Sequence, residues 1–178
     1  MIICLGAAGL GWLAIHGFPF LKSRYEGVAA HSAELRNLGV RAIPARDVPV
    51  AALLLFGDSI IGRGFNTVRR DGNAGGHAEI NTITDAMRSF GIDAFNKLDR
   101  DRLTLISTFE PCAMCKGAIL EYRIRNVRYV KAKSMLHWLR EDLRGISYDI
   151  GKTRIGPVGL QDSLFRMHPN YDPTRTDR

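Results

Sequence analysis

The most constraining feature of this chain is a set of three metal-binding side chains carried by two separate stretches. The tripeptide His-Ala-Glu begins at His77, and the pentapeptide Pro-Cys-Ala-Met-Cys contains Cys112 and Cys115. The two cysteines are three positions apart in the expected first turn of a helix, so their sulfur atoms point the same way. His77 also falls at an expected helix start. The fold must therefore bring two helix starts together at the edge of a sheet, where open α/β proteins place their sites.

This residue set predicts a catalytic zinc site. His77, Cys112 and Cys115 supply three ligands and leave the fourth tetrahedral position for water, as in catalytic rather than structural zinc sites. A helix N-terminus lowers the pKa of a thiol, and the thiolate is the form that binds metal. Glu79 is not needed as a ligand, so we expect it to act as the base that takes the proton from the zinc-bound water. We expect one Zn²⁺ per chain.

Two other interpretations of the cysteine pair are weaker. A redox Cys-x-x-Cys motif would leave His77 and Glu79 without a role and would require a thioredoxin-like strand before the cysteines. A structural zinc site would need a fourth protein ligand. His31, His137 and His168 could supply one, but none lies at a ligand-type spacing. The chain has three cysteines, an odd number, which favours a reducing compartment over a disulfide scaffold.

The hydrophobic pattern predicts a sheet covered by helices on both faces. Apolar residues at helical spacing, and short runs of β-branched and aromatic residues, alternate along the chain. We expect helices over 25–39, 77–90, from Pro111 onward and over 134–144, and strands over 48–56, 59–65, 103–109 and 127–130. The first two strands form a hairpin, and 66–76 is a glycine-rich loop. Alternating helices and strands of this kind are typical of α/β proteins.

The ends of the chain differ from this middle part. Residues 1–21 contain no Asp, Glu, Lys or Arg, and as a helix they would extend about 32 Å, enough for a bilayer core of about 30 Å. Lys22 and Arg24 follow, so a membrane anchor here would leave the remaining chain in the cytoplasm. Four glycines and Pro19 lower the hydropathy and the helix propensity of this segment, which stands against an anchor. The alternatives are an N-terminal helix packed on the domain or a start codon assigned too far upstream. We expect an apolar segment over 1–24, a catalytic domain over 25–150 and a partly ordered tail over 151–178.

The net charge of +7 and the pI near 9.7 suit a polyanionic partner or an anionic membrane surface. The segment 116–144 contains eight basic residues and three acidic ones, and Tyr122, Tyr129 and Trp138 lie among them. Cations beside aromatic rings suit phosphates and unstacked bases. An ordinary solvated surface would give the same composition, so both interpretations stay open.

Residues 48–133 resemble the cytidine deaminase superfamily, and in particular its bacterial tRNA adenosine deaminase and guanine deaminase branch. The resemblance is carried by Val48-Pro49-Val50-Ala51, Gly64-Phe65-Asn66, His77-Ala78-Glu79, the eleven residues from Phe109 to Ile119, and Arg123-Ile124. It implies a three-layer α/β/α fold with a mixed five-stranded sheet, hydrolytic deamination and a homodimer. It also implies that Asn66 binds the substrate, although loop capping would explain an Asn here as well.

The resemblance favours a hydrolase of carbon–nitrogen bonds that converts adenosine to inosine in tRNA. Gly75-Gly76 and the segment 131–138 depart from the tRNA enzymes, so a free base, nucleoside or nucleotide of guanine or cytosine type is the alternative substrate. A membrane-tethered zinc-binding interaction module without turnover is an alternative of another class. Glu79 favours the enzyme, because a module without turnover needs no proton transfer.

Overall fold

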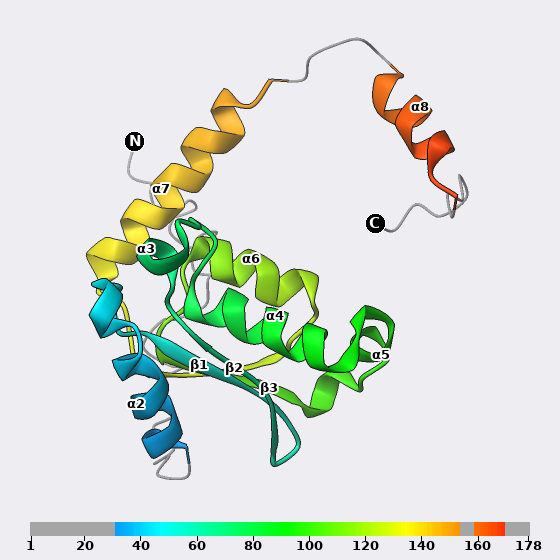
Figure 1. Cartoon of the computed structure of the whole chain (residues 1–178). Helices are drawn as coiled ribbons and strands as arrows, with labels where there is room; N and C mark the ends of the chain where they lie inside the picture. The colour runs from blue at the N-terminus through cyan, green and yellow to red at the C-terminus, as the bar shows by residue number, and fades with distance from the viewer. Residues whose placement is uncertain (1–30, 154–158, 170–178) are drawn as a thin grey trace, which may run out of the picture. The chain divides into compact units, whose positions relative to one another are not determined.

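The computed structural model describes residues 31–153 and 159–169, and the chain divides into two compact units, Met1–Ala132 and Lys133–Arg178 (Figure 1). The first unit contains a sheet of β1 (Ala51–Phe56), β2 (Ser59–Phe65), β3 (Leu103–Phe109) and β4 (Asn126–Lys131). The strand order is β2-β1-β3-β4. The strand β1 pairs antiparallel with both β2 and β3, whereas β4 pairs parallel with β3. The sheet is therefore mixed, as expected.

The hairpin of β1 and β2 confirms the sequence prediction. Gly57 and Asp58 form its two-residue turn, and Gly57 has a φ of 61°, a left-handed conformation that suits glycine. Side chains of β1 alternate between the two faces of the sheet, as the period of a strand requires. Leu53 and Leu55 join one hydrophobic cluster, and Leu54 joins the other. The strand is thus buried on both faces, which explains why its sequence is apolar throughout.

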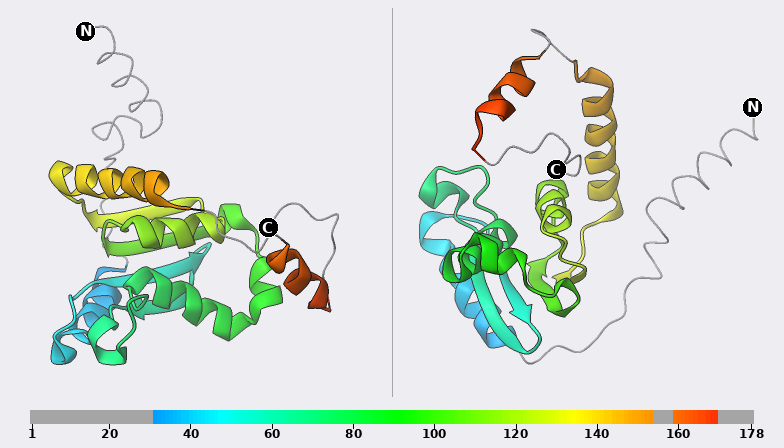
Figure 2. Two further views of the ribbon diagram at one scale, coloured as in Figure 1. Left: turned by 90° about the horizontal axis from the view of Figure 1, so that it is seen from above. Right: turned by 90° about the vertical axis from the view of Figure 1, so that its right-hand side faces the viewer.

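Helices cover both faces of this sheet (Figures 1 and 2). The helix α2 (Ser32–Val40) packs on one face through Leu35 and Leu38. On the other face lie α4 (Ala78–Phe90) and α6 (Ala113–Glu121), which contribute Ile83 and Ile119 to the second cluster. The predicted three-layer α/β/α arrangement is therefore confirmed in the first unit.

The five-stranded sheet implied by the resemblance is wrong for the described residues, which contain four strands. After β4, the sequence from Met135 carries apolar residues at helical rather than alternating spacing. The chain accordingly continues as a long helix, and no further strand follows within 132–153 or 159–169. The strand β4 is consequently an edge strand, and most of its residues are exposed.

Short helices complete the first unit, and several of them were not predicted. They are the 3₁₀ turns η1 (Ile43–Ala45) and η2 (Arg100–Arg102), α3 (Val68–Asp71) and α5 (Ile92–Asn96). The stretch 66–76 had been expected to be a loop throughout, but α3 forms one helical turn inside it. Gly72 ends that turn with a φ of 59°, and single turns of this length leave little periodicity in a sequence.

The second unit contains α7 (Met135–Gly151) and α8 (Leu160–Met167). Ser134 caps α7 as expected, because its hydroxyl accepts a hydrogen bond from the backbone N–H of His137. The expected end of this helix at Arg144 is wrong: α7 continues through Gly145. A glycine inside a helix costs only about 1 kcal/mol, which does not outweigh the apolar pattern that continues beyond it. The helix α8 lies in the segment expected to be a partly ordered tail.

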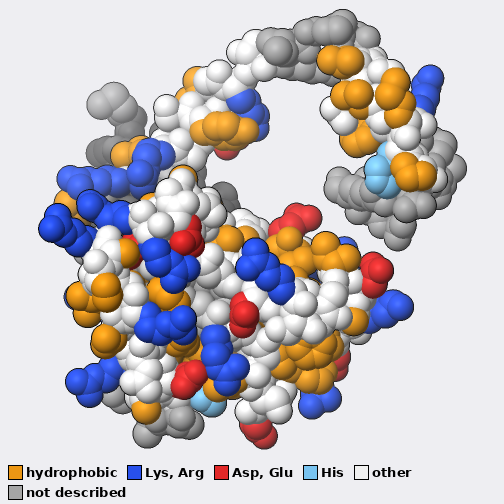
Figure 3. Space-filling model, in the orientation of Figure 1, with side chains coloured by type: hydrophobic (Ala, Val, Ile, Leu, Met, Phe, Trp, Pro, Cys, Tyr) orange, Lys and Arg blue, Asp and Glu red, His pale blue; other side chains and the backbone are white. Residues whose placement is uncertain are grey.

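The apolar segment 1–24 lies outside the described residues, and so does the proposed membrane anchor. Among the helices that the structure describes, none is both long enough and apolar enough to span a bilayer. Basic side chains outnumber acidic ones on the face shown in Figure 3, in keeping with the net charge of +7.

Candidate active site

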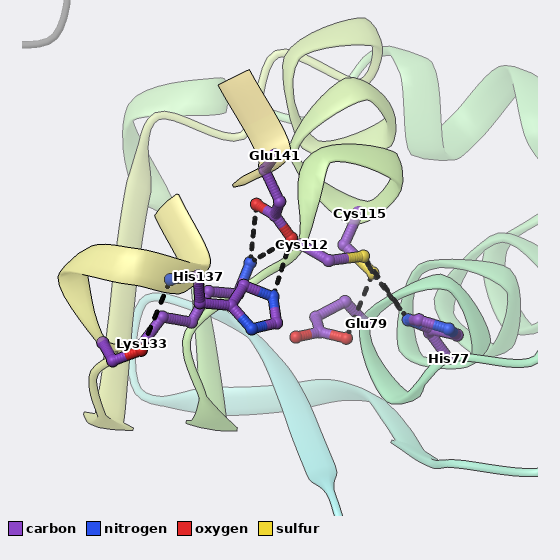
Figure 4. Close-up of polar contacts among 8 residues, drawn as sticks. His77, Glu79, Cys112, Cys115, Lys133, His137 and Glu141 are labelled. Carbon is purple, nitrogen blue, oxygen red and sulfur yellow. Dashed lines mark hydrogen bonds and ion pairs between the residues drawn. The ribbon is translucent and has the colours of Figure 1, made fainter. Parts of the chain in front are cut away.

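The first half of the site comes from the start of α4. His77 is the N-cap residue of this helix and has extended backbone angles (φ −73°, ψ 151°). Its side chain makes no capping hydrogen bond, and its Nδ1 instead faces the two cysteine sulfurs (Figure 4). Sequence analysis placed the helix start at His77, and the structure confirms this position to within one residue.

The second half comes from the start of α6. Cys112 is its N-cap residue and is partly exposed, whereas Cys115 lies one turn further on and is fully buried. The peptide N–H groups of a helix start carry a partial positive charge, which favours thiolate sulfur in both positions. The expected convergence of two helix starts is therefore present, on the face of the sheet that α4 and α6 cover.

The three donor atoms fit one tetrahedral zinc ion. Cys112 Sγ lies 3.6 Å from Cys115 Sγ, and His77 Nδ1 lies 3.5 Å from Cys112 Sγ and 3.6 Å from Cys115 Sγ. Zinc bonds of about 2.3 Å to sulfur and about 2.0 Å to nitrogen, at tetrahedral angles, place such atoms roughly 3.5–3.8 Å apart. Among the described residues, His77, Cys112 and Cys115 form the one group of three positioned to hold a metal ion.

The two thiols differ strongly in acidity. The hydrogen bond with Cys115 lowers the pKa of Cys112 to about 5, against the opposing effect of its partial burial. The same hydrogen bond raises the pKa of Cys115, and its burial and the neighbouring Glu79 raise it further. Cys112 is therefore the thiolate of the pair near neutral pH. Because metal ligands must be deprotonated, Cys115 would have to lose its proton to hold zinc.

Glu79 lies next to these ligands and is held from two sides. It is 4% exposed, its Oε1 accepts a hydrogen bond from the Ser107 hydroxyl at 3.0 Å, and its Oε2 accepts one from the Cys115 thiol at 3.3 Å. A carboxylate buried beside a metal site and fixed in this way can move protons at the reacting centre. The structure thus places Glu79 where the sequence motif requires it.

Asn66 lies at the end of β2 and is almost fully buried. Its Oδ1 accepts a hydrogen bond from the backbone N–H of Val68 at 3.1 Å, the loop-capping contact that sequence analysis weighed as its alternative role. The amide nitrogen of Asn66 has no hydrogen-bond partner within the described parts of the chain. A substrate contact through that nitrogen stays a prediction.

Three further residues support the site and were missed by sequence analysis. Ser107 on β3 holds Glu79, as described above. Asn81 Nδ2 donates to Phe65 O, Thr67 Oγ1 and Gly76 O at 2.8, 3.0 and 3.2 Å. Thr82 Oγ1 donates to Ala52 O on β1 at 3.0 Å. The sequence does carry a signal for Asn81 and Thr82. They are polar residues four and five positions after His77, in the first turns of the helix, where side chains can face the preceding strand and loop.

The second unit contains a buried ion pair of its own. Lys133 Nζ donates to both carboxylate oxygens of Glu141 at 2.9 and 3.0 Å, and His137 Nε2 lies 3.2 Å from Glu141 Oε1 (Figure 4). His137 is thus tied to a carboxylate in its own helix and is not part of the group of three described above.

The fold and the site together define a class: a three-layer α/β protein with a Cys₂His metal centre and a buried glutamate. Residues 29–131 match the family model of the cytidine and deoxycytidylate deaminase zinc-binding region, which covers more than half of the chain. The chain belongs to this family. Zinc is accordingly the metal that His77, Cys112 and Cys115 are positioned to hold.

Curated relatives share the same region. A tRNA(Ile)-lysidine synthase of Deinococcus radiodurans is 39% identical over 101 residues, which are 56% of this chain and 16% of that protein. A tRNA-specific adenosine deaminase of Buchnera aphidicola subsp. Schizaphis graminum is 37% identical over 81 residues, 46% of this chain and 50% of that protein. The chain therefore spans half or less of the length of these two relatives.

Solved structures agree on the fold. A structure from a study of A-to-I editing by tRNA:A34 deaminases is similar with a TM-score of 0.51 and 32% identity, over 58% of this chain and 76% of that one. Guanine deaminase from Bacillus subtilis has a TM-score of 0.59 over 79% of this chain and 94% of its own, at 23% identity. The second likeness concerns the fold alone.

Proposed function

We propose that this protein is a zinc-dependent hydrolytic deaminase that converts adenosine to inosine in tRNA. The single observation that carries the chemistry is the position of Glu79, buried and hydrogen-bonded beside three side chains spaced as zinc ligands. The relatives that are named as tRNA-specific adenosine deaminases, at 37% identity for the one from Buchnera aphidicola, support the substrate.

The reaction adds water to the ring carbon that carries the amino group and then breaks the carbon–nitrogen bond. The oxygen of water stays on the ring as a carbonyl, and the amino nitrogen leaves as ammonia. When bound, zinc supplies Lewis-acid activation of water at neutral pH. Glu79 accepts a proton from the water through one carboxylate oxygen and delivers it to the departing nitrogen. Ser107 holds that carboxylate in place during both transfers.

Replacement of Glu79 tests the proposal. Glu79→Gln keeps the size of the side chain but removes the proton acceptor, so we expect turnover to fall about 10²–10⁴-fold with zinc content and folding unchanged. Glu121→Gln is the matched control, because Glu121 is exposed at the far end of α6. Ammonia release is measured on tRNA, adenosine, guanine, cytosine and their nucleotides, with zinc content recorded. Unchanged turnover in Glu79→Gln would overturn the role of Glu79.

The same panel distinguishes the substrates. Turnover on tRNA alone supports the proposal, whereas turnover on guanine or on a cytosine nucleotide would replace it with a free-base or nucleotide deaminase. Zinc binding without turnover on any member would favour the interaction module.

We also propose that the protein is a homodimer and that it lies in the cytoplasm. Analytical sedimentation of the purified protein tests the dimer. For the anchor, membrane fractionation of the full chain and of a chain beginning at Tyr25 tests whether 1–24 binds membranes.

A further inference from the structure

A second feature of the first unit is a group of four exposed arginines, two of which lie over the ring of Phe65. Arg41 and Arg46 come from the end of α2 and from η1, and Arg69 and Arg70 come from α3. The guanidinium carbon of Arg41 lies 4.6 Å from the centroid of the Phe65 ring, and that of Arg70 lies 5.0 Å from it. We call these four residues the arginine platform. Segments more than twenty residues apart in the sequence thus present their cations together.

A buried carboxylate fixes the two halves of the arginine platform to each other. Asp47 is 6% exposed, and its Oδ1 and Oδ2 accept hydrogen bonds from the backbone N–H groups of Arg69 and Arg70 at 2.7 and 3.1 Å. Both oxygens bind the first turn of α3, where a carboxylate is favoured by the unpaired peptide N–H groups. Asp47 therefore uses its charge to hold α3 against η1.

Most of the positive charge of the arginine platform is available to a partner. Arg70 pairs with Asp71, whereas Arg41, Arg46 and Arg69 have no ion-pair partner among the described residues. All four arginines are exposed. Arg46 also has a φ of 57°, in the left-handed region that a non-glycine residue seldom adopts. Position 46 thus holds an arginine where the backbone conformation would favour glycine or asparagine.

The arginine platform is connected directly to the loop that leads into the metal centre. Thr67 N donates to Gly76 O at 2.8 Å, so the residue after Asn66 contacts the residue before His77. Asn81 Nδ2 binds Phe65 O, Thr67 Oγ1 and Gly76 O at the same point. Phe65, whose ring lies under Arg41 and Arg70, is the residue directly before Asn66.

We propose that the arginine platform binds the phosphodiester backbone of an RNA whose base enters the metal centre, an inference that rests on the proposed function. The planar guanidinium group donates two parallel hydrogen bonds to phosphate oxygens, and it is less strongly hydrated than a lysine ammonium. A substrate whose base reaches His77 has its backbone next to the loop between Asn66 and His77. The connection to that loop favours RNA over a membrane surface, although Val40 and Ile43 are exposed nearby.

The test is the double variant Arg46→Asn with Arg69→Gln. Neither side chain stacks on Phe65, Asn tolerates the φ of position 46, and the backbone N–H of residue 69 remains for Asp47. We expect the Kd for a tRNA transcript, measured by fluorescence anisotropy at about 0.1 M salt, to rise about tenfold. The slope of log K against log salt should fall by about 2, one for each lost phosphate contact. The KM for tRNA should rise with the Kd.

Arg88→Gln with Lys97→Gln is the matched control, because it removes two exposed charges, one in the last turn of α4 and one at the end of α5. The control should keep the wild-type Kd and turnover. Equal weakening in both variants, or an unchanged salt slope in the first, would overturn the arginine platform. Zinc content and thermal melting confirm that the variants fold.

The experiment separates this inference from the proposed function. Tight tRNA binding that depends on the arginine platform, without deamination of any RNA, would support the RNA-binding surface and overturn the proposed deaminase activity. Deamination of tRNA with an unchanged Kd in Arg46→Asn/Arg69→Gln would do the reverse. Binding of the wild-type protein and the double variant to vesicles of phosphatidylcholine with about one quarter phosphatidylserine is measured as well. Binding to these vesicles that the double variant loses, with tRNA binding unchanged, would assign the surface to membranes and overturn the proposal.

Discussion

The helices α4 and α6 each begin at a metal-ligand position, yet they are held in place differently. Over its 13 residues, α4 buries Ala78, Glu79, Thr82, Ile83 and Ala86 against the sheet. Over its 9 residues, α6 buries Cys115 and Ile119. A zinc-ligand candidate, Cys115, is thus one of the two buried residues of α6.

The close packing of α4 comes from glycines on β2. A Cβ atom added at Gly64 would lie 2.5 Å from Ala78 O and from Thr82 N, which no side chain can occupy without movement of the backbone. Because Gly62 and Gly64 carry no side chains, α4 approaches β2 closely, and Thr82 Oγ1 reaches Ala52 O on β1. The packing of α4 on β2 therefore fixes His77 and Glu79, whereas we expect the position of the cysteines to depend more on the metal.

The largest expected effect is at the contact between β2 and α4. Gly64→Val places a branched side chain against the backbone of α4, and overpacking that the backbone cannot relieve costs about 3 kcal/mol or more. We expect little folded protein, measured as soluble yield and thermal melting. Gly117→Ala in α6 is the control: nothing lies within 4 Å of the added methyl, so we expect a gain of about 0.5–1 kcal/mol. A folded Gly64→Val protein with wild-type melting would contradict this account of α4.

The second effect tests how far α6 depends on zinc. Cys115→Ala removes a ligand and a buried side chain, so we expect zinc content to fall from one ion per chain to nearly none, with lower stability. Amide hydrogen exchange should speed up at least tenfold in α6 and much less in α4, and a chelator should produce the same difference in the wild-type protein. Retention of stoichiometric zinc would show that Cys115 is not a ligand. Equal exchange in the two helices would remove the contrast between them.

The smallest effect concerns how Glu79 is held. Ser107 is fully buried, and Ser107→Ala removes the hydroxyl that donates to Glu79 Oε1. A hydrogen bond to a charged group contributes about 1.5–3 kcal/mol, so we expect kcat to fall about tenfold or more with little change in KM or zinc content. Thr104→Ala on the same strand is the control, because the Thr104 side chain makes no hydrogen bond within residues 31–153 and 159–169. A rise in KM at constant kcat would indicate a role in substrate binding instead.

Sequence analysis predicted the elements whose residues carry a clear period. The hairpin, the start of α4 at His77 and the start of α6 at the cysteines are confirmed to within a few residues. The buried face of α4 was predicted less well. The helical spacing of Ile80, Ile83, Met87 and Phe90 predicts that all four face the core, but Phe90 is 42% exposed, and Thr82 and Ala86 are buried. The face of α4 that packs on β2 carries the small residues Thr82 and Ala86, because the strand lies too close for larger side chains.

The sequence alone determined which atoms could bind zinc and which carboxylate could move a proton. These properties follow from the identities and local spacing of His77, Glu79, Cys112 and Cys115, because each pair lies within one helical turn. The tertiary structure decided the rest: the hydrogen bond from Ser107, the close contact at Gly64 and the meeting of arginines around Phe65. These contacts join segments far apart in the chain, and the packing of the sheet and helices brings them together.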